Sequence, residues 1–219
     1  MIKTIAVAAI LTLPRVALAR SEVVANVEDE QERAMEIASS ATNNDARYQA
    51  IRTLGELRPA GAIPLLLKLL SDSNPNIRAN AARALSDMNA VEARQPLVRL
   101  LLNENDGAVI EQITFGLLKF KLKDALPRLR QLARHKQRQT RIAVLQTIGA
   151  IGSNDDVAFL AVFLDAKENQ SIQWAAAESI ERITGENFGL PLRIAHADPA
   201  AGIKRAQLWW QSNRHTFEK

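Results

Sequence analysis

The chain of 219 residues contains no cysteine. This absence excludes disulfide bonds, thiolate metal ligands, a cysteine nucleophile and a lipid anchor on an N-terminal cysteine. Aromatic residues are also scarce, at 5% of the chain against 47% for all hydrophobic residues. The core must therefore be built mainly from alanine and aliphatic side chains, and this composition favours helices over a β-sandwich.

The apolar run near the N-terminus, residues 4–13, is shorter than the ~20 residues that a membrane-spanning helix needs. Lys3 precedes this run, and Ala17-Leu18-Ala19 follows it with the small-x-small spacing of a signal-peptide cleavage site. We therefore expect a signal peptide over residues 1–19, cleaved after Ala19, and an exported, periplasmic protein. The alternative is an uncleaved anchor or a first helix of the fold.

The chain also lacks a strong excess of one charge. Its formal net charge is +4, and removal of Lys3 and Arg15 with the leader would leave 26 basic and 24 acidic residues, a net of +2. Such weak basicity gives little support for nucleic-acid binding, and no nucleic-acid partner is expected.

A repeat dominates the rest of the sequence. An apolar position recurs every 31 or 32 residues, at Leu54, Leu85, Leu117, Ile148 and Ile180. Further mostly apolar positions recur eight and four residues before each of these and three residues after it. This spacing places them on one face of an α-helix, so the sequence predicts five equivalent helices.

A second set of apolar segments lies between these helices, at residues 62–72, 94–104, 125–135 and 155–165. The first three have a proline as their third residue, and proline is favoured in the first turn of a helix: Pro64, Pro96 and Pro127. Residues 27–41 supply the corresponding helix of the first unit. The sequence therefore predicts about five helical hairpins, each of which can bury its apolar face only by stacking on its neighbours.

The repeated helix resembles the HEAT-repeat family, particularly the short bacterial HEAT-like type related to phycobilisome lyases. The pattern of that family, close to V-R-x-x-A-A-x-A-L-G-x-I-G, stands here as "IRANAARALSDMN" (77–89) and "TRIAVLQTIGAIG" (140–152). The resemblance covers residues 43–190 and implies an all-α, right-handed α-solenoid. It says little about chemistry, because one fold supports many functions.

The C-terminal segment resembles the T-G-x-x-F-G end and tryptophan-bearing last helix of bacterial HEAT-like proteins, through Thr184, Gly185, Phe188, Gly189, Trp209 and Trp210. A last repeat needs such a cap, because its stacking face would otherwise be exposed. We expect a solenoid over residues 20–189 and a loop with a capping helix over 190–219. An aromatic ligand platform is the alternative for the tryptophans.

Candidate catalytic and metal-binding residues are lacking. The histidines His135, His196 and His215 do not share a helical ligand spacing, and the pair His196 and Asp198 is too small a ligand set for a metal. The His-Glu pairs that di-iron HEAT-like hydroxylases use are missing from this sequence. We expect no catalytic residue, metal or cofactor.

Two candidate binding surfaces remain. In the family, the second helices line the concave face, and their variable positions point outward. In this chain, these positions give the predicted partner-binding residues Tyr48, Arg52, Asn80, Arg83, Asp87, Gln112, Phe115, Lys119, Gln146, Trp174, Glu178 and Arg182. Exposed aromatic residues mixed with arginine are typical of interface hot spots. The alternative is that Phe115 and Trp174 fold back against neighbouring repeats.

The second candidate surface is a basic patch over residues 119–141, with nine basic residues and one acid. It includes Lys121, Lys123, Arg128, Arg130, Arg134, Lys136 and Arg138. Such a patch is suited to an acidic protein segment, an anionic polymer or lipid headgroups, and the alternative is an ordinary solvated face.

The sequence as a whole favours an exported, non-catalytic scaffold that binds a protein partner through its concave face. The alternatives are binding of an anionic surface through the basic patch and, from the family resemblance alone, a lyase-type enzyme or enzyme subunit. Within "NPNIRANAARALSDMNA" (74–90), Arg78 is predicted to stabilise the fold through a turn carboxylate such as Asp72, whereas Arg83 is predicted to face a partner.

Overall fold

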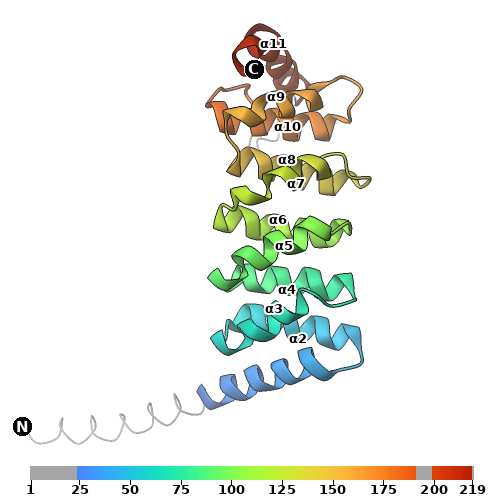
Figure 1. Ribbon diagram of the computed structural model, residues 1–219, viewed down its shortest axis with the longest axis vertical. Coiled ribbons are helices and arrows are strands. Elements are labelled where there is room, and N and C mark those ends of the chain that lie inside the picture. Colours follow the sequence, from blue (N-terminus) through green and yellow to red (C-terminus); the bar gives the residue numbers. More distant parts are fainter. Residues whose placement is uncertain (1–23, 191–198, 219) are drawn as a thin grey trace, which may run out of the picture.

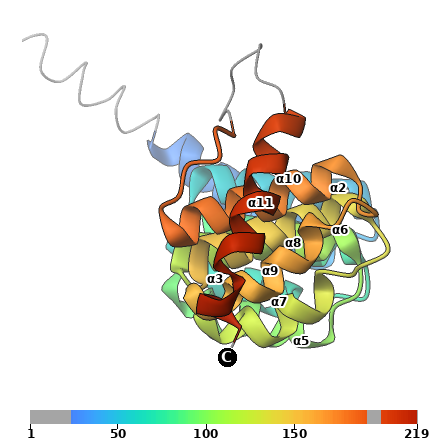
Figure 2. The same cartoon turned by 90° about the horizontal axis from the view of Figure 1, so that it is seen from above.

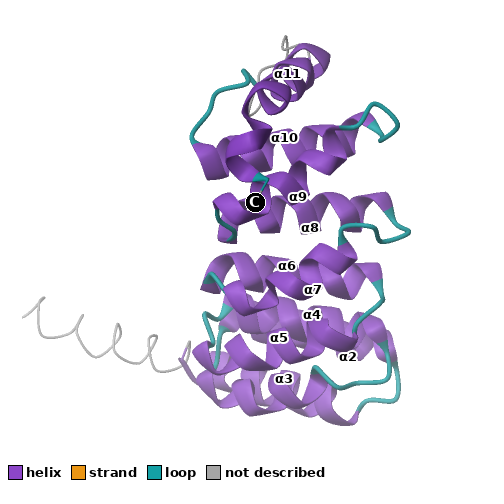
Figure 3. Cartoon of the chain, turned by 45° about the horizontal axis from the view of Figure 1, so that its top comes forward, coloured by secondary structure: helices purple, strands orange, loops and turns teal. Residues whose placement is uncertain are grey.

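The computed structural model describes residues 24–190 and 199–218. These residues form helices joined by short turns and contain no strand (Figure 3). The hairpins stack in sequence order into one column, with the first described helix at the bottom and the C-terminal helix at the top (Figure 1). The predicted all-α solenoid is confirmed, whereas the predicted leader over residues 1–19 lies outside the described residues.

The helices alternate between long and short. A first helix covers residues 24–40, and the long helices that follow are α2 (Asn44–Leu57), α4 (Pro75–Asp87), α6 (Gly107–Phe120), α8 (Arg138–Ile151) and α10 (Gln170–Thr184). The short helices between them are α3 (Ile63–Leu69), α5 (Arg94–Asn103), α7 (Leu126–Leu132) and α9 (Val157–Ala161), and the last helix is α11 (Pro199–Phe217). A 3₁₀ turn precedes each short helix: η1 (Ala60–Ala62), η2 (Val91–Ala93), η3 (Lys123–Ala125) and η4 (Asn154–Asp156); η5 (Val162–Leu164) follows α9.

The two kinds of helix form two layers. Successive long helices from α2 to α10 pack directly on one another, and each short helix packs on the long helix that follows it. We call the outer surface of α2, α4, α6, α8 and α10 the long-helix face, and that of α3, α5, α7 and α9 the short-helix face.

Side-chain caps start most of the long helices. The side chains of Asn43, Asn74, Asp106 and Asn169 accept hydrogen bonds from backbone N–H groups in the first turns of α2, α4, α6 and α10. These bonds satisfy donors that the helix itself leaves unpaired. These caps recur with the same spacing as the apolar repeat, so the four helices begin at equivalent positions of the repeat.

The core follows the sequence repeat. Leu54, Leu85, Leu117, Ile148 and Ile180 are all fully buried. Close packing of the long helices is possible because small residues lie between them, and a Cβ at Gly149 would lie only 2.6 Å from the Cα of Ser179. The α8–α10 contact therefore has no room for an additional methyl group.

The C-terminal helix closes the stack. In Figure 2, α11 lies across the end of the column, and it contacts α9 and α10. Trp209 and Trp210 are half-buried and pack against the core; the Trp209 ring lies 5.6 Å from the rings of both Phe188 and Phe217. The predicted capping role of these tryptophans is confirmed. The 190–199 loop with His196 and Asp198 lies mostly outside the described residues.

Ion pairs join consecutive hairpins at one edge of the stack. The arginine four residues after the helix cap pairs with a carboxylate of the next inter-hairpin loop, as Arg47–Asp72, Arg78–Glu104 and Arg141–Glu168. Ile110 occupies the equivalent position in α6 and is fully buried, so this position forms no ion pair in the third unit. We call the three pairs the arginine ladder.

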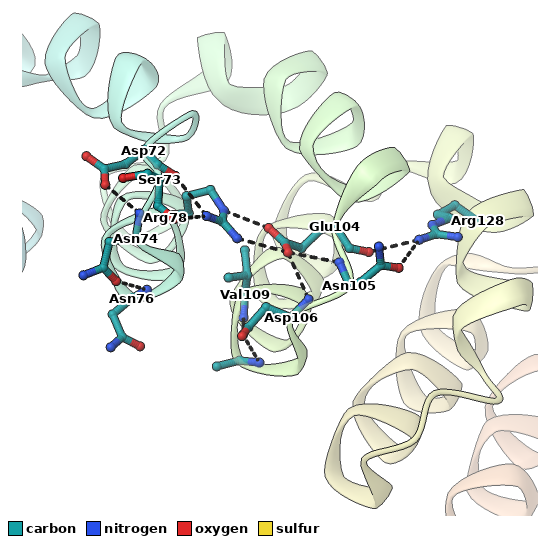
Figure 4. Close-up of polar contacts among 11 residues, drawn as sticks. Asp72, Ser73, Asn74, Asn76, Arg78, Glu104, Asn105, Asp106, Val109 and Arg128 are labelled. Atoms are coloured by element: carbon teal, nitrogen blue, oxygen red, sulfur yellow. Dashed lines mark hydrogen bonds and ion pairs between the residues drawn. The ribbon is translucent and has the colours of Figure 1, made fainter.

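The prediction that Arg78 stabilises the fold through a turn carboxylate is confirmed, but that carboxylate is Glu104 and not Asp72. Figure 4 shows that its guanidinium group binds the Glu104 carboxylate, at 2.9 and 3.2 Å, and that it donates to the backbone oxygens of Asp72 and Ser73 rather than to the Asp72 side chain. The Asp72 carboxylate instead accepts from Arg47 of the preceding hairpin. A single arginine thus fixes its own turn and the next hairpin at the same time.

The arginine ladder also lowers the pKa of the Asp72 carboxyl group. Burial raises the pKa of its carboxyl group, but hydrogen bonds from Arg47 and from a backbone N–H, together with the charges of Arg47 and Arg78, outweigh this effect. The pKa therefore lies below its ordinary value, because the folded state favours the carboxylate.

Candidate functional site

A groove on the long-helix face brings together half of the predicted partner-binding residues. It has a volume of ≈ 490 Å³ and crosses three successive helices, α2, α4 and α6. The predicted residues that line it are Tyr48, Arg52, Asn80, Arg83, Asp87 and Gln112. They lie in three different repeats, so only the stacking of the hairpins makes them neighbours.

The floor of this groove is made of small residues. Gly55, Ala79 and Ala84 line it, and Ala79 and Ala84 are buried. Small side chains leave room above the α2–α4 contact, so the longer side chains on either side form walls. The groove is therefore shaped by the same small residues that allow the helices to pack closely.

The other six lining residues were not among the predicted ones, and two of them, Asn76 and Ala108, lie at the rim on α4 and α6. They occupy the same position of the repeat, immediately before the buried residues Ile77 and Val109. Extending the variable positions by one helical turn toward the N-terminus would have included them.

Charged side chains along the groove are held by exposed pairs within one helix. Arg52 pairs with Glu56, and Arg83 pairs with Asp87, each four residues apart. The Arg83 guanidinium group also lies 4.1 Å from the centre of the Phe115 ring, which joins α4 to α6. Exposed pairs of this kind contribute little to stability, so an incoming ligand can exchange them at low energetic cost.

The remaining predicted residues lie elsewhere on the long-helix face. Lys119 donates a hydrogen bond of 2.6 Å to the backbone oxygen of Ser86, which anchors α6 on α4. Gln146 donates to Glu178 across the α8–α10 contact. Trp174 is half-buried and packs against the core.

A third ion pair within one helix, between Arg182 and Glu178, lies in α10. Glu178 also accepts from Gln146, so these polar residues form one small cluster at the C-terminal end of the long-helix face. Nine of the twelve predicted residues therefore fall into two groups on this face: six line the groove, and Gln146, Glu178 and Arg182 form the cluster.

The predicted basic patch does not form one surface. Because α6, α7 and α8 alternate in direction, Lys121 and Lys123 lie at the turn between α6 and α7, whereas Lys136 and Arg138 lie at the opposite end of α7. These cations therefore occupy two different edges of the stack.

Several arginines of this segment bind their own chain. Arg128 donates to the backbone oxygens of Leu101 and Glu104, and Arg130 pairs with the buried carboxylate of Asp156. The Arg134 guanidinium group lies 5.4 Å from the centre of the Phe163 ring. These contacts give three of the seven predicted patch residues a structural role.

The described residues offer no preassembled metal site. Residues 24–190 and 199–218 contain no cluster of three or more histidine or acidic side chains that could hold a metal ion. Within the same ranges, no helix is both long enough and apolar enough to span a membrane.

Comparison with known proteins agrees with the repeat architecture. The family model for HEAT repeats matches residues 32–118 and 106–181, two overlapping regions that together span most of the chain. The chain belongs to the HEAT-repeat family. No curated protein matches it.

A similar fold is also found among solved structures. The crystal structure of an engineered protein from a structural genomics consortium matches with a TM-score of 0.54, covering 83% of this chain and 96% of that chain. Its sequence identity of 20% supports a likeness of fold alone.

Proposed function

We propose that this HEAT-repeat protein is an exported, non-catalytic scaffold that binds an extended segment of a partner protein in the groove on its long-helix face. The observation that carries the proposal is the convergence of six variable repeat positions from α2, α4 and α6 around one groove. Variable surface positions on a regular stack can change without loss of the fold, so they are the positions at which such a scaffold acquires a partner.

The chemistry of the groove is suited to a peptide backbone. Asn76, Asn80 and Gln112 carry amide groups, which both donate and accept hydrogen bonds, as a peptide group does. Tyr48 adds an aromatic ring with a polar hydroxyl group, a combination common at interface hot spots. An extended segment would present unpaired backbone groups to these amides.

The rigidity of the stack favours such binding. The arginine ladder and the close contacts between long helices fix the relative positions of α2, α4 and α6. A preformed groove loses little conformational entropy when a ligand binds, so more of the contact energy is available as affinity.

Site-specific cross-linking tests this proposal. A photoreactive phenylalanine derivative is placed at Asn80, inside the groove, and in a second protein at Gln211, which is exposed on α11. After illumination in an envelope extract of the source cells, we expect a discrete adduct from position 80 and none of that mass from position 211.

Substitutions then test the chemistry of the groove. Tyr48→Ala combined with Gln112→Ala should abolish the adduct from position 80, whereas Gln211→Ala should leave it unchanged. An adduct that survives the double substitution in a folded protein would reject the groove as the binding site.

Export is a separate part of the proposal and rests on the sequence of residues 1–19. The intact mass of the protein isolated from its source should correspond to a chain that begins at Arg20. A protein that retains Met1 would refute cleavage after Ala19.

A further inference from the structure

A second groove opens on the short-helix face, between α3 and α5. It has a volume of ≈ 770 Å³, and its apolar lining comes from Leu67, Leu70, Pro96 and Leu100. Lys68 on α3 and Arg99 on α5 line the same groove, and both are exposed. This groove is distinct from the proposed peptide site, which lies on the opposite layer.

The carboxylates in this groove are already neutralised. Asp72 and Glu104 line it, but Asp72 pairs with Arg47. Glu104 pairs with Arg78, as Figure 4 shows. Within residues 24–190 and 199–218, by contrast, no ion pair involves Lys68 or Arg99.

The two helices that form the groove carry positive charge only. Together, α3 and α5 contain three cations and no aspartate or glutamate: Lys68, Arg94 and Arg99. The groove therefore combines apolar walls with unpaired cations, and it is complementary to an acidic amphipathic segment.

The first helix of this same chain carries the complementary charge. Residues 24–40 contain five acids and one base, a net charge of −4, whereas residues 41–219 contain 24 basic and 18 acidic residues, a net charge of +6. Glu28, Glu32 and Glu36 follow one another at four-residue spacing and are all exposed. Like charges at this spacing repel, and none of the ion pairs of the described residues relieves them.

The position of this helix leaves its acidic stripe available. Ala34 and Ala38 hold it on the stack, and its first turns, from residue 24 to residue 30, are mostly exposed. It lies at the bottom of the column, while the α3–α5 groove opens higher up (Figure 1). The acidic stripe of one molecule is therefore placed to meet the groove of another molecule.

We propose that the chain associates with itself, and that the acidic helix 24–40 of one copy docks in the α3–α5 groove of a second copy. The two surfaces are different, so the contact is head-to-side and leaves one free groove and one free helix at the ends. Association of this kind extends into short open chains, and it leaves the long-helix face of every copy accessible.

Sedimentation velocity of the purified full-length protein tests the proposal. At low ionic strength we expect the average sedimentation coefficient to rise with protein concentration. At ~1 M salt the Debye length falls to about 3 Å, so the association should weaken strongly. A protein that stays monomeric at every concentration at low salt would overturn the proposal.

Charge reversal identifies the two surfaces. Glu28→Lys/Glu32→Lys and Lys68→Glu/Arg99→Glu should each weaken self-association by at least ~10-fold, because like charges would then face each other. A mixture of the two variants should associate again, since each helix then meets a groove of opposite charge. Circular dichroism of each variant shows whether it has remained folded.

A charge-matched control uses exposed cations far from the groove. Lys204→Glu/Arg214→Glu on α11 changes the net charge by the same amount as the groove variant and should leave association unchanged. Equal weakening by this control, or the absence of restored association in the mixture, would rule out the helix-in-groove contact.

Discussion

The two arginines of α4 provide a sharp test of what holds the stack together. Arg78→Ala removes a guanidinium group that is 17% exposed and that binds Glu104, which is 7% exposed. It also leaves the backbone oxygens of Asp72 and Ser73 without this donor. Removing one partner of a buried ion pair leaves an uncompensated charge, so we expect a loss of about 3 kcal/mol in the free energy of unfolding.

The matched substitution is Arg83→Ala in the same helix. This side chain is 48% exposed, and its contacts are an ion pair with Asp87 and the face of the Phe115 ring. An exposed ion pair is worth about 0.5 kcal/mol and an exposed cation–π contact about the same, so the total loss should stay below about 1 kcal/mol. The two substitutions should therefore differ by about 2 kcal/mol.

Urea unfolding followed by circular dichroism measures both losses. Equal losses for Arg78→Ala and Arg83→Ala would refute the assignment of Arg78 to the fold and of Arg83 to the surface. The combined variant Arg78→Met/Glu104→Leu should recover most of the stability lost by Arg78→Ala, because it leaves no buried charge. Failure to recover it would mean that the loss comes from the hydrogen bonds that Arg78 and Glu104 make to the loop backbone, and not from the uncompensated charge.

Single substitutions can test the close helix contacts and the arginine ladder in the same way. Gly149→Ala should lower the free energy of unfolding by about 2 kcal/mol, because the added Cβ would lie 2.6 Å from the Cα of Ser179. The control is Gly61→Ala, whose added Cβ has no atom within 4 Å and which should change the free energy of unfolding by less than about 0.5 kcal/mol. The lowered pKa of Asp72 means that its contribution is present above the ordinary value of 3.8 and is lost as the pH falls through the lower folded value. Asp72→Asn should therefore flatten the loss of stability below about pH 4, and an unchanged acid profile would show that the pair with Arg47 does not contribute there.

Much of the fold could be predicted because its signals are local. The spacing of Leu54, Leu85 and Leu117 places one apolar face on each long helix, and all three residues are buried. Asn43 and Asn74 mark the starts of helices because a side-chain oxygen reaches backbone N–H groups only two or three residues away. Such short-range relations can be read directly along the chain.

The site could be predicted only in part. The variable positions Tyr48, Asn80 and Gln112 were assigned to one face, but the sequence does not show that they line a single groove with Asn76 and Ala108. That grouping depends on how closely α2, α4 and α6 approach one another, and small residues between the helices set this approach.

The pairing and grouping of charged side chains was the least predictable feature. Arg78 lies six residues from Asp72 but pairs with Glu104, 26 residues away, and cations adjacent in the sequence from Lys121 to Arg138 are distributed over two edges of the stack. The sequence by itself determined the helices, their caps and their buried faces, because these follow from a periodicity of a few residues. Only the tertiary structure decided which charges meet, because the stacking of hairpins brings together side chains about one repeat apart, and the reversal of direction at each turn separates neighbours in the sequence.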